Sequence, residues 1–359
     1  MLNQTKIQTS TESYRVAVTD WVPGDDIARM LGYELELLHH TPVYFYHDYP
    51  IPDEVDILLT FGPYNKILPV WRQAAEREAH RRPVVVHWNT EGLPDLRLPM
   101  PVMHAVGTLR SLVGRMEQSN SKLSRGLYSF PLVSWIDHIL FRYRYLGDYG
   151  YAYHKGWLHV LADTSTIYGE LRTKTGLPTL YAPWGASRYW YNDLGLERDI
   201  DVLWMGKRGT FRRSRILDMV FDELKHHGIK IHIADNEENP FIFGAERIDY
   251  LNRSKITLNI TRTWYDDNFS RFTLAAPNRS LIVSEPVLPH CQEYKENVHY
   301  VSARIKDLAK TIVYYLEHEA ERQDIVKNAY TLATTELLFC RSLQKMLDAA
   351  IKYRVTINR

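Results

Sequence analysis

Short apolar runs alternate with polar, helix-like segments along the first half of the chain. Residues 14–22, 56–63 and 83–92 are rich in apolar and β-branched side chains and end near Gly or Pro. Runs of this kind are typical of strands buried on both faces of a parallel sheet. Residues 67–82 predict a crossover helix, and residues 159–185 again predict strand, helix and strand. The first half therefore predicts βαβ units.

The same alternation continues after Pro183-Trp184-Gly185, which we interpret as a hinge. The helix predicted over residues 212–228 carries one apolar stripe and stops at a glycine. The other predicted elements are strands at 199–206, 229–235, 256–262 and 280–286, helices at 246–255 and 270–276, and a helical end over 305–354. This order predicts an α/β protein with two domains, residues 1–184 and 185–338, and a cleft between them.

Composition limits the classes of partner. The 359 residues exceed what one hydrophobic core usually supports, and 45% of them are apolar, as in ordinary globular proteins. The formal net charge of +1 gives no general attraction for nucleic acid or anionic membranes. We therefore expect no nucleic-acid partner, and any anion binding must be local. Cys291 and Cys340 form no metal or redox motif, and we expect them to be buried thiols in a reducing cytoplasm.

A cluster of positively charged residues lies within residues 205–215, which read MGKRGTFRRSR. A strand ends at Gly206, Lys207 and Arg208 follow, and a helix is predicted to start near Ser214. Backbone N–H groups and cations then meet at the carboxyl edge of a parallel sheet, where ligands of such sheets bind. A phosphate or diphosphate would satisfy these groups. The alternative is a solvated cationic face.

A second anion site is predicted within residues 266–280. Ser270 can cap a short helix, which places Arg271 in the first turn, where a cation opposes the helix dipole unless an anion is bound. Two helix starts that each carry an arginine could grip one diphosphate, because guanidinium groups bind phosphate bidentately. The dinucleotide fingerprint and the P-loop pattern are both missing, which disfavours a nicotinamide enzyme and an ordinary nucleoside triphosphatase.

The second half of the sequence resembles the C-terminal half of GT-B glycosyltransferases, closest to the CgeB-like and group 1 branches. The segments that carry this resemblance are residues 201–217, 250–262, 268–285 and 296–330. The N-terminal half is similar only in outline. The resemblance implies two Rossmann-like domains that face each other across a cleft, and a C-terminal helix, residues 339–359, that crosses back to the N-terminal domain.

The resemblance also implies transfer of a sugar, without a metal, from a nucleotide diphosphate sugar to the hydroxyl of a small-molecule, glycan or lipid-linked acceptor. A UDP-sugar is the expected donor. The family's diphosphate-binding arginines fall on Arg213 and Arg271, and the basic loop with Ser270 would complete that site. The family's ribose-binding position falls on Thr273, where most members have Glu, and this difference predicts weaker donor binding or a different donor. A non-catalytic scaffold, a sugar-binding protein and a sugar-nucleotide epimerase are the alternatives.

A fainter similarity, to the phage DNA β-glucosyltransferases, covers residues 84–96 and implies that Glu91 is the catalytic base. The alternative is that Glu91 only stabilises a turn. Asp20, at the end of the first predicted strand, is the second candidate. We expect His87 to be a half-buried strand residue. The acidic pair Asp266-Asp267 is interpreted as a solvated loop, so no metal site is predicted.

Aromatic side chains are dense over residues 126–160. Three interpretations stay open: an acceptor-facing surface, peripheral contact with a membrane, and plain packing or a homo-oligomer contact. The N-terminus lacks a signal-peptide pattern, and no run of about 18 apolar residues occurs. We therefore expect a cytoplasmic protein or one that is peripheral to the inner face of the membrane.

Overall fold

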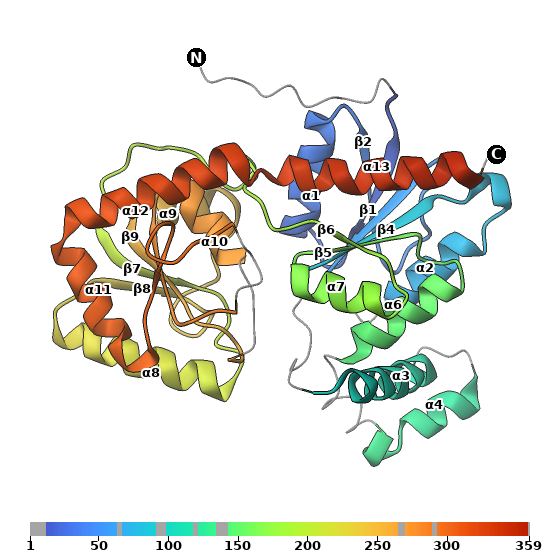
Figure 1. Cartoon of the computed structure of the whole chain (residues 1–359), viewed down its shortest axis with the longest axis horizontal. Coiled ribbons are helices and arrows are strands. Elements are labelled where there is room, and N and C mark those ends of the chain that lie inside the picture. The colour runs from blue at the N-terminus through green and yellow to red at the C-terminus, as the bar shows by residue number, and fades with distance from the viewer. Residues whose placement is uncertain are drawn as a thin grey trace.

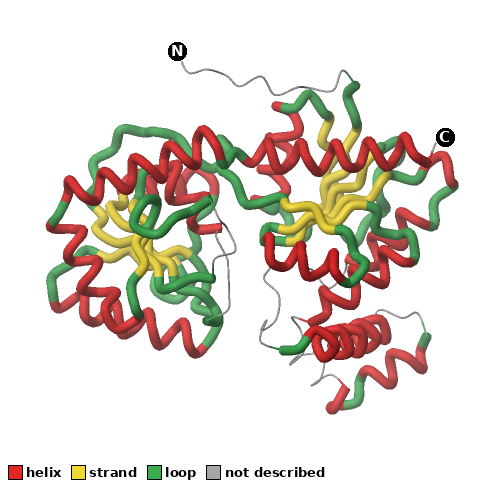
Figure 2. Tube along the Cα trace, in the orientation of Figure 1, coloured by secondary structure: helices red, strands yellow, loops and turns green. Residues whose placement is uncertain are grey.

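Two α/β domains lie side by side in the computed structural model of the chain (Figure 1). The structure describes residues 12–62, 67–90, 98–117, 121–133, 143–264, 270–288 and 293–357. In each domain, helices surround a central sheet (Figure 2). Within the described residues, neighbouring strands of both sheets run parallel.

The N-terminal sheet has six strands within the described residues, in the order β2-β1-β3-β4-β5-β6. These strands are β1 (Arg15–Asp20), β2 (Thr41–Tyr46), β3 (Ile57–Phe61), β4 (Val84–Asn89), β5 (Val160–Asp163) and β6 (Thr179–Tyr181). Every residue of β3 and β4 is buried, which explains why apolar side chains predominate in both strands.

Helices cover both faces of this sheet and extend beyond it (Figure 1). They are α1 (Asp26–Leu37), α2 (Ile67–Ala75), η1 (Ala79–Arg81), α3 (Met100–Glu117), α4 (Lys122–Tyr128), α6 (Arg144–His154) and α7 (Thr166–Lys174). Helix α1 follows β1 directly because Asp25 caps it, accepting hydrogen bonds from the N–H groups of Ile27 and Ala28. This cap brings the start of α1 close to the carboxyl end of β1.

The C-terminal sheet has five strands within the described residues, in the order β11-β10-β9-β7-β8. The strands are β7 (Ile200–Met205), β8 (Ile231–Ala234), β9 (Ser254–Asn259), β10 (Leu281–Ser284) and β11 (Val301–Ser302). The chain adds β8 on one side of β7 and β9 on the other side. The order of the strands therefore reverses between β7 and β9. In open α/β sheets such a switch point is the usual place for a ligand.

The helical elements of this domain are α8 (Phe211–His226), α9 (Gly244–Arg253), α10 (Ser270–Ala275), η3 (Ala276–Asn278), η4 (Ile305–Asp307), α11 (Leu308–Glu317), α12 (Glu319–Thr331) and the π-helical turn η5 (Leu332–Glu336). The apolar stripe predicted for α8 is confirmed, since Leu217, Val220 and Leu224 are buried in the core.

The last helix, α13 (Phe339–Ile357), returns to the N-terminal domain and lies along it (Figure 1). Its buried side chains Phe339, Leu343 and Met346 belong to the N-terminal core. The two crossings between domains run side by side: the N–H of Ala186 donates to the carbonyl of Leu337 (2.8 Å), and the N–H of Phe339 donates back to Ala186 (3.0 Å). The return helix that the resemblance implied is therefore present.

Candidate functional site

The candidate site lies at the switch point of the C-terminal sheet, where β7 and β9 end. Gly206 follows β7 with a φ of 116°, a conformation that side-chain-bearing residues rarely adopt. A Cβ atom at this position would also lie 3.0 Å from Nη2 of Arg271. The backbone conformation therefore favours glycine here, and the missing side chain leaves room for the close approach of the arginine.

Arg271 spans the switch point from the first turn of α10. Its Nε donates to the carbonyl of Met205 (2.9 Å) at the end of β7, and its Nη1 donates to Oδ1 of Asn259 (3.1 Å) at the end of β9. The guanidinium carbon lies 4.3 Å from the centroid of the Trp204 ring. These contacts hold the cation at the edge where both strands end.

Arg213 reaches the same ring from the first turn of α8. Thr210 caps this helix by accepting a hydrogen bond from the N–H of Arg213, and Nη1 of Arg213 donates to the carbonyl of Lys207 (3.0 Å). Its guanidinium carbon lies 5.7 Å from the Trp204 ring centroid. The structure thus brings Arg213 and Arg271 together at one indole. Their contact with a diphosphate stays a prediction.

The rest of the basic loop divides into two kinds of residue. Lys207 is exposed, as a ligand-binding lysine at the loop would be. Arg208 is buried and surrounded by carboxylates: its Nε donates to Asp235 (2.7 Å), and it also pairs with Asp218 and Glu238. These carboxylates already balance the charge of Arg208, which argues against its predicted place among the diphosphate ligands.

Glu285 is a site residue that we did not single out from the sequence. It is buried just after β10, pairs with Arg212 through both carboxylate oxygens, and accepts hydrogen bonds from the N–H (2.7 Å) and Oγ1 (2.9 Å) of Thr261. It thereby ties the start of α8 to the ends of β9 and β10. Its position at the end of a predicted strand on the ligand edge was the signal that could have revealed it.

Ser270 and Thr273 lie in α10, beside Arg271. Ser270 is the first residue of this helix, and Thr273 is completely buried. The hydroxyl of Thr273 donates to the carbonyl of Ser270 (2.9 Å), within its own helix. This placement turns the hydroxyl into the domain and argues against the predicted ribose contact.

On the N-terminal side, Asp20 ends β1 and is mostly buried. It pairs with Arg29 of α1, whose guanidinium carbon lies 3.9 Å from the Tyr44 ring centroid. Burial raises the pKa of the Asp20 carboxyl, and the charge of Arg29 opposes that rise. The other candidate base, Glu91, lies outside the described residues, as do Asp266, Asp267 and Cys291.

His87 was expected to be half buried, and this expectation is wrong. The residue is completely buried in β4, and its ring lies between Oγ1 of Thr60 (3.0 Å) and the hydroxyl of Tyr149 (2.9 Å). Tyr149 in turn donates to Asn89 (2.9 Å). Loss of solvent around the imidazole lowers the pKa of His87 to about 3, so the ring is neutral and structural.

The two domains contact each other close to the candidate base. Nη1 of Arg247 in α9 donates to Oδ2 of Asp26 at the start of α1 (2.8 Å). The Arg247 guanidinium also lies 5.5 Å from the Trp190 ring centroid in the linker. On β6, the Tyr181 hydroxyl donates to the Glu293 carboxylate (3.0 Å). These contacts position the N-terminal sheet edge relative to the C-terminal domain.

The aromatic segment 126–160 is described except for residues 134–142. Tyr145 and Tyr149 of α6 are buried in the N-terminal core, and Tyr151 packs edge-on against Trp157. The described part of this segment after residue 142 therefore favours the packing interpretation over an acceptor surface.

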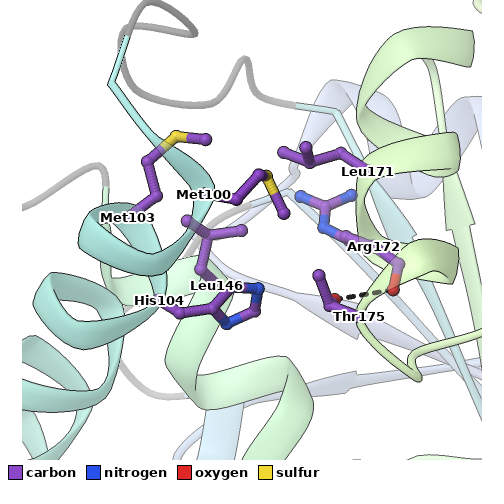
Figure 3. A pocket seen from close by; sticks show the side chains of 7 residues that line it. All are labelled: Met100, Met103, His104, Leu146, Leu171, Arg172 and Thr175. Carbon is purple, nitrogen blue, oxygen red and sulfur yellow. Dashed lines mark hydrogen bonds between the residues drawn. The ribbon is translucent and has the colours of Figure 1, made fainter.

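A small crevice lies between α3, α6 and α7 (Figure 3). It is lined by Met100, Met103, His104, Leu146, Leu171, Arg172 and Thr175. The guanidinium of Arg172 pairs with Asp163 at the end of β5. Because its lining is mostly apolar and its arginine is already paired, this crevice is a poor match for a diphosphate.

The sequence and the fold of this chain were compared with those of known proteins. Residues 212–348 match a family model described as "Glycosyl transferase-like". No curated protein matches the sequence. Among the described residues, no helix is long and apolar enough to cross a membrane.

Several solved structures share the fold over nearly the whole chain. Anabaena HepE in complex with UDP superposes with a TM-score of 0.54 at 10% identity and covers 95% of this chain and 100% of its own. Sucrose-phosphate synthase from Thermosynechococcus elongatus gives 0.54 at 12% identity, with 96% and 99% covered. A glycosyltransferase from Rickettsia africae ESF-5 gives 0.51 at 11% identity, with 95% and 98% covered. The predicted two-domain GT-B fold is therefore confirmed.

Proposed function

We propose that this chain, a GT-B glycosyltransferase of the group 1 type, moves a sugar from a nucleotide diphosphate sugar to an acceptor hydroxyl. The observation that carries this proposal is the meeting of Arg213 and Arg271 at Trp204 on the switch point. Of the similar structures, HepE was determined with UDP, with UDP-glucose, and with UDP and glucose. A UDP-sugar is accordingly the donor that we expect.

The arginines would bind the diphosphate and stabilise it as the leaving group. Negative charge develops on the diphosphate when its bond to the sugar breaks, and fixed cations stabilise such charge without reorganisation. Arg271 is held by two strand ends, and Arg213 lies where the N-terminus of α8 adds its own partial positive charge. Because these groups supply positive charge, we propose that the reaction needs no metal.

The N-terminal domain would supply the acceptor site and the base. A carboxylate at the end of a strand can take the proton of an acceptor hydroxyl as its oxygen attacks the anomeric carbon. Asp20 and Glu91 are the candidates, and Asp20 lies near the contact between Asp26 and Arg247. The acceptor is proposed to be a small molecule, a glycan or a lipid-linked sugar.

The experiment is a thermal-shift titration with UDP in the presence of EDTA, on the wild type and on Arg271→Ala. Charge-assisted hydrogen bonds contribute about 1.5–3 kcal/mol each, so the variant should bind UDP about 10- to 100-fold more weakly. Arg253→Ala is the matched control, because Arg253 pairs with Asp199 on the surface. Wild-type affinity in Arg271→Ala would overturn the assignment of the diphosphate site.

A binding protein that does not transfer sugar is the second candidate, and the position of Thr273 favours it. A hydroxyl bonded to the carbonyl of its own helix cannot replace the two oxygens of a ribose-binding carboxylate. Slow hydrolysis of a bound UDP-sugar would support the transferase, and binding without hydrolysis would support the alternative. Isomerisation of the donor, followed by NMR, would indicate an epimerase.

A further inference from the structure

Charges of alternating sign lead from one domain to the other at the start of α1. Asp20, at the end of β1, pairs with Arg29 in the second turn of α1. Asp26, the first residue of α1, accepts a hydrogen bond from Nη1 of Arg247 (2.8 Å), which belongs to α9 of the C-terminal domain. We call these four residues the charge row: Asp20, Arg29, Asp26 and Arg247.

The two middle members of the charge row are neighbours on α1. Asp26 and Arg29 are three positions apart, and side chains at this spacing lie next to each other on a helix. Tyr189 of the linker lies beside them. Burial raises the pKa of its hydroxyl, and the charges of Asp26, Arg29 and Arg247 also act on it. Arg29 is therefore placed between two carboxylates, those of Asp20 and Asp26.

Arg247 is committed to Asp26. Its side chain is 7% exposed, and its guanidinium carbon lies 5.5 Å from the centroid of the Trp190 ring. Among the described residues, Asp26 supplies the carboxylate within ion-pair distance, and Nε and Nη2 of Arg247 have no hydrogen-bond partner. Such a pair is costly to break, because an uncompensated buried charge would remain. Arg247 therefore keeps Asp26 occupied, which leaves Arg29 to pair with Asp20.

We propose that Arg247 is a positioning residue for the candidate base Asp20 and that it acts through the other two members of the charge row. Without Arg247, the carboxylate of Asp26 would compete for Arg29. With Arg247 in place, Arg29 keeps the Asp20 carboxylate charged, as a general base must be to accept a proton. The inference rests on the proposed function. Because Arg247 belongs to the other domain, the base would be fully ionised only while the domains are in contact.

Other titratable groups also surround Asp20. Burial raises the pKa of the Asp25 carboxyl, and the charge of Asp20 adds to that rise. After β2, the N–H of His47 donates to the carbonyl of Asp20 (3.2 Å), and Nε2 of His47 lies 3.3 Å from the carboxylate of Asp48. The substitutions in the test keep these groups, so a change in the titration of Asp20 would report on the charge row.

The test follows the titration of the Asp20 carboxyl in the full chain by carbon-13 NMR, with Asp20→Asn to identify its signal. In Arg247→Gln the midpoint should rise by about one pH unit, because Asp26 draws Arg29 away and burial then dominates. In Asp26→Asn/Arg247→Gln the midpoint should return to the wild-type value, because the competing carboxylate is gone. Arg253→Gln, at the other end of α9, is the control and should titrate like the wild type.

The same variants are assayed for slow hydrolysis of UDP-glucose and for the thermal shift with UDP. Arg247→Gln should move the acid limb of the hydrolysis profile to higher pH, with about a tenfold loss of rate below the midpoint and unchanged UDP affinity. The double variant should recover the wild-type profile. Melting temperatures show first that each variant folds. Arg247→Met, whose apolar side chain suits the buried position, is measured in parallel in case Arg247→Gln does not fold.

An unchanged midpoint in both single variants of Arg247 would overturn the inference. A double variant with the same raised midpoint as Arg247→Gln would also overturn it, since a merely structural contact is lost in both. A raised midpoint with an unchanged hydrolysis profile would remove Asp20 as the base, and the inference with it. A raised midpoint in a chain that neither binds UDP nor hydrolyses UDP-glucose would keep the link between Arg247 and Asp20 and reject the proposed function.

Discussion

The guanidinium carbon of Arg271 lies 4.3 Å from the centroid of the Trp204 ring. Trp204 is completely buried in strand β7, and its indole N–H donates to the carbonyl of Gly206 (2.8 Å). One side chain thus supports both the arginine and the glycine that approaches it. A cation over an indole is attracted by the negative face of the ring, which restrains Arg271 without neutralising it.

Replacing Trp204 by Phe should weaken UDP binding. The smaller ring attracts the guanidinium less strongly and loses the hydrogen bond to Gly206. Cation–π contacts contribute about 0.5–2 kcal/mol, so we expect roughly a 3- to 30-fold loss of affinity in calorimetric titration. Trp157→Phe, in the N-terminal domain, is the control and should bind like the wild type. An unchanged affinity in Trp204→Phe would show that the indole does not position Arg271.

Glu285→Gln should lower the free energy of unfolding. The substitution removes the charge that pairs with Arg212 and weakens two hydrogen bonds from Thr261. Because Glu285 is buried whereas Arg212 is partly exposed, we expect a loss of about 1–3 kcal/mol in urea unfolding. Asp199→Asn breaks a solvent-exposed pair with Arg253 and should cost much less stability. Equal losses in both variants would contradict the structural role of Glu285.

His87 should make the protein acid-sensitive. Burial lowers the pKa of its imidazole to about 3, whereas in the unfolded chain the group titrates near 6.5. Between these values the unfolded state binds the extra proton, so stability falls as the pH falls from about 6.5 towards 3. His87→Gln should flatten the dependence of the unfolding free energy on pH. Exposed His226 provides the control His226→Gln, which should leave the slope unchanged.

Glu34 of α1 should lower the stability of the protein as the pH rises, which is the opposite of the effect of His87. It is buried, and loss of solvent raises the pKa of its carboxyl to about 6 against a usual 4.5, although a hydrogen bond from Ser187 opposes this. The protonated Glu34 carboxyl contributes its full share to the free energy of unfolding below about pH 4.5. This contribution is lost as the pH rises through about 6, because the native state must then hold a buried charge. Glu34→Gln should therefore stabilise the protein at pH 8, by up to about 2 kcal/mol. Lower stability at pH 8 would contradict this sign. The exposed Glu36→Gln is the control.

The layered architecture could be predicted because it depends on local patterns. Apolar runs such as 83–92 and the stripe of α8 are visible in sequence, and their alternation determines a parallel α/β fold. The ends of strands also indicated where ligands bind, and the resemblance to GT-B glycosyltransferases then selected Arg213 and Arg271 at that edge.

Pairings between distant residues could not be predicted in this way. The carboxylates around Arg208 come from Asp218, Asp235 and Glu238, and only the folded loop brings them together. The direction of the Thr273 hydroxyl depends on the rotation of α10, which its short sequence does not determine. The contact of both arginines with the Trp204 ring could not be predicted either. In the sequence, a tryptophan within a strand cannot be distinguished from any other core residue.

The return of α13 to the first domain has a consequence for synthesis. Phe339, Leu343, Met346 and Ala350 are integral to the core around β1 and β4, yet they are separated from those strands by the entire second domain. The ribosome completes the second domain before α13 emerges, so the second domain can form its core while the first domain still lacks α13. We therefore expect the N-terminal core to stay incomplete until residue 350 leaves the exit tunnel.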